Sequence, residues 1–487
     1  MSLHTAVALT YLAASLLFIF GLRALGSPRT ARGGMHMAEV GMVLAIAGTL
    51  LNHEVISFSW ILGGMALGSA LGIFIALWTP MTAMPQRTAL SHAFGALAAA
   101  LVGIAHYHEH GPALGTDQLI ALGFEVMFGS LTVTGSLMAF GKLQEWLPGR
   151  PLTYRGQNVV NVTLFLVIAA LTIYVIVSPS AWWAFYLMVG LATLFGVFLV
   201  IPIGAADMPV VIALLNSYAG LAASATGFAL HNNILIIAGA LDGASGFILS
   251  MLMCRAMNRS ITNVLFGAFG KAPERAAVAV EAPDYRTASP EEAASVLDSA
   301  RLVIIVPGYG MAVSQAQHSV KKLADLLVRN GTDVRFAIHP VAGRMPGHMN
   351  VLLAEAGVEY DQLYDLEHIN DDFERADVAI VIGANDVVNP AARSDPSSPI
   401  HGMPILNADK ARSVMVLKRS MNPGFAGIDN ALFYLRNTMM VFGDATKTVD
   451  ALVSELKELR PARQELPEPR LRPSYAGTPS AGHAAGR

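Results

Sequence analysis

The sequence predicts a multi-pass α-helical membrane domain of about nine transmembrane helices, followed by a Rossmann-like, doubly wound α/β domain. Three observations support this fold class. Of the 487 residues, 54% are hydrophobic and only 14% are charged, whereas roughly 25% are charged in soluble globular proteins. Residues 1–260 hold apolar stretches of about twenty residues, long enough to cross a ~30 Å hydrocarbon core as helices. Beyond residue 301, short β-branched runs alternate with helical segments, which is typical of a parallel sheet.

Apolar stretches bounded by polar loops place the transmembrane helices along the first part of the chain. They are expected near residues 3–24, 35–51, 56–78, 88–109, 117–141, 158–177, 182–202, 208–230 and 233–256. The first stretch is not followed by a small-residue cleavage site, and its positive charges come after it. We therefore expect it to be retained as a helix and not removed as a signal peptide.

The positive charges of this part indicate its orientation. Every Lys and Arg falls in an alternate loop or after the last apolar stretch, whereas the other loops, such as "NHEV" and "EHGPALGTD", have none. The charged residues are Arg23, Arg29, Arg32, Arg87, Lys142, Arg150, Arg155, Arg255 and Arg259. By the positive-inside rule, we expect the N-terminus outside and everything beyond residue 256 in the cytoplasm.

Composition divides the chain into four parts. Residues 1–260 form the expected membrane domain, and 261–295, rich in Ala, Pro and charge without an apolar period, suit a linker. The runs "LVIIV", "VRFAIH", "VAIVIG", "SVMVLK" and "MMVFG" predict strands of a domain over 296–460, and 461–487 is expected to be a disordered tail. A net charge of −3 without a basic block gives no reason to propose nucleic acid binding. Cys254 is the single cysteine, so we expect no disulfide framework and no cysteine metal site, and redox chemistry would need a bound cofactor.

The stretch "VPGYGMAVSQAQ" at 306–317 indicates a dinucleotide-binding turn. It follows an apolar run and opens a helical segment, where Gly308 and Gly310 would let the backbone approach a pyrophosphate. The match to the usual glycine pattern is partial, because Val313 stands at the third glycine position. The alternative is a glycine turn that holds no ligand.

Two features favour NADP over NAD as the nucleotide. The second strand ends in "AIHPVAGR", without the carboxylate that usually binds a ribose 2′-hydroxyl. The fourth run ends in Lys418, Arg419 and Ser420, whose two cations and hydroxyl suit a 2′-phosphate. The alternative for the Lys-Arg pair is a solvated turn.

Six longer motifs then occur in order: "PGYGMAVSQAQ", "HPVAGRMPGHMN", "GANDVVNPAA", "HGMP", "KRSMNPGFAG" and "FGDA". Together with the membrane part they closely resemble the beta subunit of proton-translocating NAD(P) transhydrogenase, from about residue 1 to 455. The resemblance implies that this chain binds NADP(H) and forms a proton channel over 1–260, while an alpha subunit binds NAD(H). It also implies direct hydride transfer between the nucleotides, coupled to proton movement, in a dimer of alpha–beta units. A separate alpha chain and the lack of a transit peptide favour a bacterial inner membrane.

The resemblance also assigns NADP(H) contacts position by position. Two positions depart from the family pattern: Phe425 replaces a tyrosine and cannot donate a phenol hydrogen bond, and Lys447 comes one residue late. The expected contacts are Gly308, Tyr309, Gly310, Met311, Ala312, Val313, Val341, Ala342, Gly343, Arg344, Met345, Pro346, Gly383, Ala384, Asn385, Asp386, Val387, Gly402, Met403, Lys418, Arg419, Ser420, Met421, Asn422, Pro423, Gly424, Phe425, Asp444 and Ala445.

In the membrane part, the resemblance makes His92 the proton-relay histidine, and a near-neutral pKa suits such a residue. Asn216 matches the channel asparagine and is expected to hydrogen-bond His92 or channel water; the alternative is interhelical packing. Asp207 starts the eighth helix, either as a cap or as a coupling residue that faces the NADP domain.

Further polar residues lie within the expected spans. Glu125 is another plausible buried carboxylate. Ser245 matches a family serine, but Ala244 replaces the serine expected beside it and Asp242 is an unexpected acid nearby. The histidines of "HYHEH", at 106–110, are interpreted as a solvated helix end and not as a metal site.

Two other functions remain open at this point: an NADP-regulated ion channel or transporter, and an NADP-binding module that regulates a partner. The stretch "VPGYGM" is not a potassium filter, because it lacks the preceding Thr and lies in the soluble part.

Overall fold

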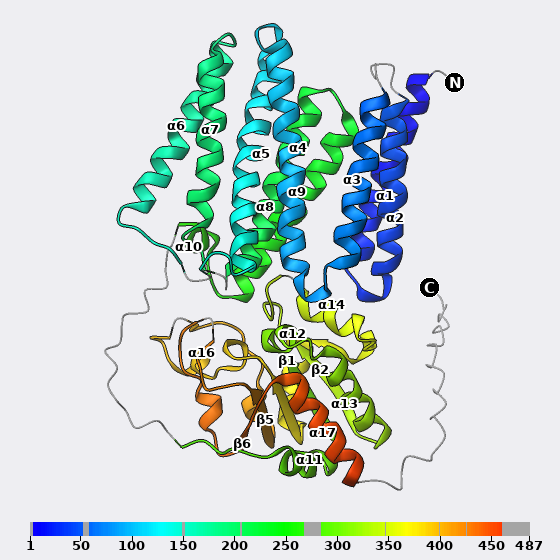
Figure 1. Cartoon of the computed structure of the whole chain (residues 1–487), viewed down its shortest axis with the longest axis vertical. Helices are drawn as coiled ribbons and strands as arrows, with labels where there is room; N and C mark the ends of the chain where they lie inside the picture. The colour runs from blue at the N-terminus through cyan, green and yellow to red at the C-terminus, as the bar shows by residue number, and fades with distance from the viewer. Residues whose placement is uncertain are drawn as a thin grey trace, which may run out of the picture.

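The computed structural model describes residues 3–51, 58–148, 151–204, 207–266, 284–345, 347–398, 400–424 and 426–459. A bundle of long helices lies above an α/β domain, and the two parts meet at one end of the bundle (Figure 1). The predicted fold class is confirmed, since apolar helices are followed by a parallel six-stranded sheet with helices.

Within the described ranges, nine helices are long and apolar enough to cross a membrane. Helix α2 begins seven residues before the expected 35, because Ser27 precedes a Pro that is well placed in a first helical turn, and the polar turns that follow carry no apolar signal. The spans are α1 (Leu3–Leu25), α2 (Pro28–Leu50), α3 (Phe58–Trp78), α4 (Met84–His110), α5 (Thr116–Leu143), α6 (Gln157–Val177), α7 (Trp182–Val200), α8 (Met208–Ala229) and α9 (Asn233–Ala256).

Helices α8 and α9 pack backbone to backbone. A Cβ atom on Gly220 would lie 2.3 Å from the amide nitrogen of Gly243, and one on Gly239 would lie 2.3 Å from that of Ser224. Small residues at such a seam let two membrane helices approach closely. The relative position of α8 and α9 is therefore fixed by glycine.

The segment expected as a linker, 261–295, contains α10 (Ile261–Phe266) and the start of α11 (Pro290–Asp298), which continues into the predicted domain. Ser289 caps α11 by accepting from the backbone N–H of Glu292. The buried face of α11, with Leu297, joins the core of the α/β domain. Residues 267–283 and the expected tail, 461–487, lie outside the described residues.

The sheet has the strand order β3-β2-β1-β4-β5-β6, and all its neighbouring strands pair in parallel. Five strands match the runs recognised in the sequence; β3 was missed because it has only three residues, none of them fully buried. The strands are β1 (Leu302–Pro307), β2 (Asp333–Ile338), β3 (Leu363–Asp365), β4 (Val378–Ile382), β5 (Ser413–Lys418) and β6 (Thr438–Phe442). The other helices are α12 (Tyr309–Val313), α13 (Gln317–Arg329), α14 (His348–Glu355), α15 (Leu366–Ile369), α16 (Ala391–Ser394) and α17 (Ala445–Leu459), with 3-10 turns η1 (Met81–Ala83), η2 (Gly111–Ala113), η4 (Tyr360–Gln362), η5 (Asn370–Arg375), η6 (Asp386–Val388), η7 (Ala408–Lys410) and η8 (Ala431–Tyr434).

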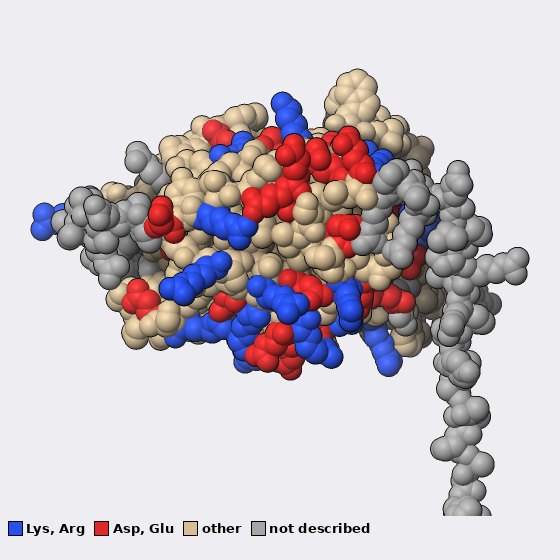
Figure 2. Space-filling view, turned by 90° about the horizontal axis from the view of Figure 1, so that it is seen from below, with Lys and Arg blue, Asp and Glu red and all other residues tan. Residues whose placement is uncertain are grey.

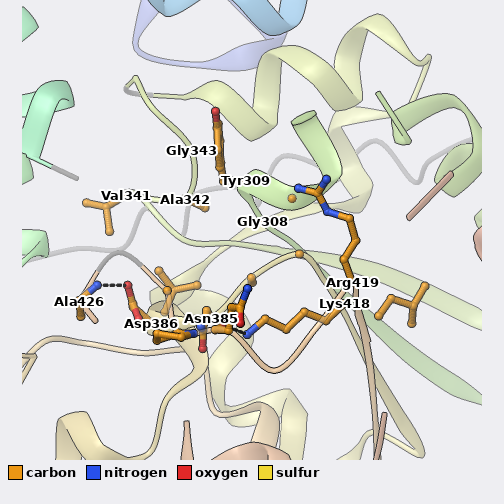
Figure 3. A pocket seen from close by; sticks show the side chains of 18 of the residues that line it. Gly308, Tyr309, Val341, Ala342, Gly343, Asn385, Asp386, Lys418, Arg419 and Ala426 are labelled. Atoms are coloured by element: carbon orange, nitrogen blue, oxygen red, sulfur yellow. Dashed lines mark hydrogen bonds between the residues drawn. The ribbon is translucent and has the colours of Figure 1, made fainter. Parts of the chain in front are cut away.

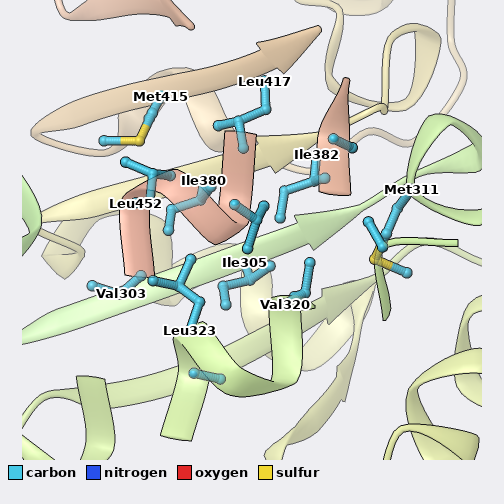
Figure 4. Packing of buried hydrophobic residues seen from close by; sticks show 14 of the residues in the cluster. Val303, Ile305, Met311, Val320, Leu323, Ile380, Ile382, Met415, Leu417 and Leu452 are labelled. Carbon is cyan, nitrogen blue, oxygen red and sulfur yellow. The ribbon is translucent and has the colours of Figure 1, made fainter. Parts of the chain in front are cut away.

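Apolar side chains of the central strands meet those of α13 and α17 on one face of the sheet (Figure 4). Ile305 of β1 and Ile380 of β4 pack there with Leu323 and Leu452 of these helices. A parallel sheet covered on both faces needs apolar strands, which explains the uninterrupted β-branched runs. Seen from the side away from the bundle, acidic and basic side chains are interspersed (Figure 2), as suits a domain that faces water.

Candidate functional site

A cavity of about 710 Å³ lies at the carboxyl ends of the parallel strands. Strand order reverses there between β1 and β4, and this crevice is where open α/β sheets bind ligands. The predicted contacts that line it are Gly308, Tyr309, Gly310, Val341, Ala342, Gly343, Gly383, Ala384, Asn385, Asp386, Val387, Met403, Lys418, Arg419, Ser420, Asn422, Pro423, Gly424 and Ala445. The lining also includes residues that the sequence did not indicate: Met257, Arg259, Ser314, Ile400, Leu417, Ala426 and Gly443.

The glycines after β1 are required by backbone packing. A Cβ on Gly308 would lie 2.3 Å from the amide nitrogen of Ala384, and one on Gly310 would lie 2.7 Å from the Cα of Gly383. The Gly310 N–H also donates to the Gly383 carbonyl at 3.0 Å. These glycines therefore hold the turn after β1 against the turn after β4, and they leave the cavity wall without side chains.

The turn after β4 offers polar groups to the cavity. Asp386 Oδ2 accepts from the backbone N–H of Ala426 at 3.0 Å (Figure 3). Asn385 Oδ1 accepts from Asn430 at 2.9 Å, but the buried amide nitrogen of Asn385 has no hydrogen-bond partner among the described residues. A buried donor without a partner destabilises the protein by about 1–3 kcal/mol. An acceptor oxygen on a ligand would satisfy it.

Two cations stand at the end of β5. Lys418 runs toward Asn385, whereas Arg419 extends away from it (Figure 3). Lys418 Nζ donates to the carbonyl of Asn422, and burial lowers the pKa of Lys418 while Asp386 and Asp429 raise it. Arg419 is exposed and forms no hydrogen bond or ion pair with any residue in the described ranges. Its guanidinium is available to an anionic ligand.

Arg344 turns toward the membrane helices and does not line the cavity. Its guanidinium carbon lies 4.2 Å from the centre of the Tyr309 ring, and Nη1 donates to the Leu143 carbonyl at the end of α5, 3.3 Å away. Nη2 lies 3.5 Å from a carboxylate oxygen of Glu145. A cation at the carboxyl end of a helix is favourable, so Arg344 connects the α/β domain to α5.

Two buried histidines fix the loop that carries Arg344. His339 Nε2 lies 2.8 Å from the Pro404 carbonyl, and its Nδ1 accepts from the backbone N–H of Val341. His348 Nδ1 accepts from the backbone N–H of Arg344 at 3.1 Å. Burial lowers the pKa of His339 and of His348 to about 4, so both rings are neutral near pH 7.

The remaining predicted contacts lie elsewhere. Gly402 approaches the end of α9, because a Cβ there would lie 2.4 Å from Asn258 Nδ2. Asp444 caps α17 by accepting from the backbone N–H of Thr446. Pro346 and Phe425 lie outside the described residues. Met311 and Ala312 belong to the core, Val313 is exposed, and Met345 and Met421 are not among the cavity residues.

The end of α9 joins the membrane domain to the cavity. Asn258 Nδ2 donates to the His401 carbonyl at 2.9 Å. Arg259 lines the cavity and pairs with Asp207, since its Nη1 donates to both carboxylate oxygens, at 2.9 Å to Oδ1 and 2.8 Å to Oδ2. Burial raises the pKa of Asp207, and Arg259 opposes this rise. Asp207, the residue before α8, is thus connected to the cavity through its ion pair with Arg259.

Asn216 forms its side-chain hydrogen bond with Asp242 and not with His92. Asn216 Nδ2 donates to Asp242 of α9 at 3.0 Å, and His92 Nδ1 is buried without a partner in the described part of the chain. No hydrogen bond therefore joins Asn216 to His92 Nδ1 among these residues, and the alternative expectation, a contact of Asn216 with channel water, stays a prediction. The Ser245 hydroxyl donates to the backbone carbonyl of Asp242, one turn earlier in α9.

Glu125 lies between three helices. It is buried in α5, where a Cβ on Gly103 of α4 would lie 2.9 Å from its carboxylate carbon. Its carboxylate also faces the side chain of Thr226 in α8. Lys142, expected as a loop charge, is buried: its Nζ donates to the carbonyls of Val200, the last residue of α7, and of Ile201 and Ile203 beyond it. It fixes the turn that leads toward Asp207. At the opposite end of the bundle, the histidines at 106–110 do not form a metal-binding group with any described residue.

A multi-span helical bundle joined to a doubly wound sheet, with a cavity at the reversal of strand order, defines a multi-pass membrane protein with a Rossmann-like domain. The family model described as NAD(P) transhydrogenase beta subunit matches residues 7–455, so the chain belongs to this family. Two known proteins named NAD(P) transhydrogenase subunit beta, from Rhodospirillum rubrum and from a named strain of that species, are each 48% identical to it over 462 residues. The match covers 93% of this chain and 99% of each relative.

Proposed function

We propose that this chain binds NADP(H) and conducts protons for a transhydrogenase in which an alpha subunit binds NAD(H). The observation that carries the proposal is the composition of the cavity. It contains Arg419, which has no protein partner among the described residues, and Arg259, which comes from the membrane domain. An anionic nucleotide in this cavity would therefore contact both parts of the chain.

The cavity suits NADP better than NAD. Lys418 and Arg419 would recognise the 2′-phosphate by charge-assisted hydrogen bonds, which are stronger than neutral ones. His339, and no carboxylate, follows β2, where NAD-binding sheets usually carry an acid for the ribose hydroxyl. The amide nitrogen of Asn385 would donate to an oxygen of the nucleotide.

Hydride transfer between two nicotinamides requires close approach and exclusion of water, and no protein acid or base. We assign positioning to the residues of this chain. The glycine turn with Gly308 and Gly310 shapes the wall, and Tyr309 stacks on Arg344 beside α5. Direct transfer then needs the alpha subunit to place its nucleotide at the open side of the cavity.

Two contacts would couple the cavity to the membrane. The ion pair of Asp207 with Arg259 links it to α8, and Arg344 links the loop after β2 to α5. A change in nucleotide charge or occupancy would alter both contacts, and linkage requires that proton binding in the membrane alter nucleotide affinity in return.

In this proposal residues 1–260 conduct the proton, 261–295 connect the parts, 296–460 bind the nucleotide, and 461–487 form a tail. His92, Asn216, Glu125 and Ser245 belong to the proton path, and Asp207 to coupling. The N-terminus would lie outside a bacterial inner membrane and the NADP domain in the cytoplasm, as the positive-inside rule requires. Two alpha–beta units would form a dimer.

The proposal is tested by measuring hydride transfer and proton pumping in the same preparation. The chain is reconstituted with its alpha subunit in vesicles, and hydride transfer and proton uptake into the lumen are measured together. We expect His92→Asn to abolish pumping while hydride exchange between bound nucleotides survives, because that step uses no membrane residue. Proton flux that needs NADP but involves no hydride transfer would instead support the regulated channel, and the proposal would fail.

A further inference from the structure

Asp242 is an ionisable residue in the middle of a membrane span. It is the tenth of the 24 residues of α9, so it lies roughly 14 Å from the start of the helix at ~1.5 Å per residue. Its side chain is exposed on the surface of the chain. Carboxylates at such depth are costly in lipid and almost always face a protein interior or a water-filled cavity. This surface of α9 therefore faces water or protein, and not lipid.

The position of the carboxylate is fixed by α8. Asn216 Nδ2 donates to Asp242 Oδ1 at 3.0 Å, and it is the only hydrogen-bond partner of this carboxylate among the described residues. Asn216 itself is pressed against α9, because a Cβ on Gly246 would lie 2.9 Å from its amide nitrogen. The glycine seam holds the two helices together and keeps this pair in place, while Oδ2 of Asp242 forms no hydrogen bond with any described residue.

No described Lys, Arg or His forms an ion pair with Asp242. The carboxylate is thus not neutralised by a fixed cation, and a proton can neutralise it instead. The partner Asn216 can accept a hydrogen bond through its amide oxygen while it donates to Asp242. The pair can consequently interact with water in both protonation states of the acid.

The depth of Asn216 matches that of His92. His92 and Asn216 are each the ninth residue of their helices, α4 and α8. Both helices start on the side of the α/β domain (Figure 1), since η1 before α4 packs on α14 and Asp207 before α8 pairs with Arg259. At ~1.5 Å per residue both side chains lie about 12 Å inside. Helix α4 also packs directly on α8.

We propose that Asp242 is a proton-carrying residue of the membrane path, held by Asn216, which lies at the depth of His92. This inference rests on the proposed proton translocation. The carboxylate takes one proton from hydronium, which becomes water, and forms a neutral acid. The acid then gives the proton to a water molecule on the other side of the pair, and the carboxylate is restored. No charge or proton accumulates over one cycle.

The experiment uses the full chain with its alpha subunit in vesicles and compares Asp242→Asn with Asp242→Glu. Asn keeps a group that can accept from Asn216 but cannot carry a proton, and Glu keeps the carboxyl group. Lumen acidification during turnover and hydride exchange between bound nucleotides are both measured. We expect Asp242→Asn to slow acidification by roughly a hundredfold or more, since a positioned proton-transfer group typically contributes that much. Hydride exchange should stay near the wild-type rate, and Asp242→Glu should recover most of the acidification.

The matched control is Glu39→Gln, which removes another carboxylate from within a span, on α2, where it pairs with His36. We expect it to pump at the wild-type rate. Normal pumping by Asp242→Asn would overturn the inference, and so would equal losses in Asp242→Asn and Glu39→Gln. Loss in both Asp242 variants would show a packing role and would also overturn it. A wild-type protein that transfers hydride without pumping would instead overturn the proposed function.

Discussion

Removal of the Arg419 guanidinium should weaken NADP binding selectively. Arg419 lines the cavity and forms no hydrogen bond or ion pair with any other described residue, so Arg419→Ala removes no such contact within the described protein. A charge-assisted hydrogen bond contributes about 1.5–3 kcal/mol, and each 1.4 kcal/mol is about tenfold in affinity. Because Arg419 is exposed and screened by solvent, we expect the lower end, roughly a tenfold loss for NADP. NAD lacks the 2′-phosphate, so its affinity should hardly change.

The assay is titration calorimetry of the purified full chain with NADP and, separately, with NAD. The control is Arg412→Ala, which removes an 82% exposed arginine at the opposite end of β5, where the Asp377 pairing is 3.7 Å long. It should leave both affinities unchanged. An unchanged NADP affinity in Arg419→Ala, or an equal loss for NAD, would refute 2′-phosphate recognition at this position.

Three further outcomes follow from the contacts around the cavity. Arg344→Ala should leave NADP affinity within about twofold but slow coupled turnover, because Arg344 binds α5 and not the cavity; a tenfold loss of affinity measured by calorimetry would restore the direct contact implied by the resemblance. Asp207→Asn should leave Arg259 uncompensated beside the cavity, so NADP(H) should bind more tightly and leave more slowly in stopped-flow measurements; unchanged release would contradict this coupling. Because His339 has a pKa of about 4 in the folded chain and about 6.5 in the unfolded chain, the unfolded chain binds the proton first as pH falls. The free energy of unfolding should therefore decrease by about 3 kcal/mol in total between about pH 6.5 and about pH 4. Urea unfolding of His339→Gln should show a correspondingly smaller pH dependence, and an unchanged slope would show that other groups cause it.

The sequence alone determined the elements that depend on local pattern. Apolar stretches long enough to span a membrane predicted the nine helices. Runs of β-branched residues predicted five of the six strands, because strands of a parallel sheet are buried on both faces and are therefore apolar throughout. The short strand β3 and the helix α11 escaped detection, since three half-exposed residues or a single apolar face of nine residues carry too weak a period. The glycine turn and the cations after β5 were also recognisable, because each is a contiguous motif.

Tertiary structure decided which of these residues share a site. Arg259, which follows α9, lines the cavity. Asp207, 52 residues earlier in the sequence, pairs with Arg259. Asn216 pairs with Asp242 of the neighbouring helix, and Arg344 turns from the nucleotide cavity to α5. A motif specifies the type and spacing of its side chains, but helix packing, here fixed by glycine contacts, determines their direction and their partners. For that physical reason the α/β domain could be predicted from the sequence, whereas its contacts with the membrane helices could be identified only in the folded chain.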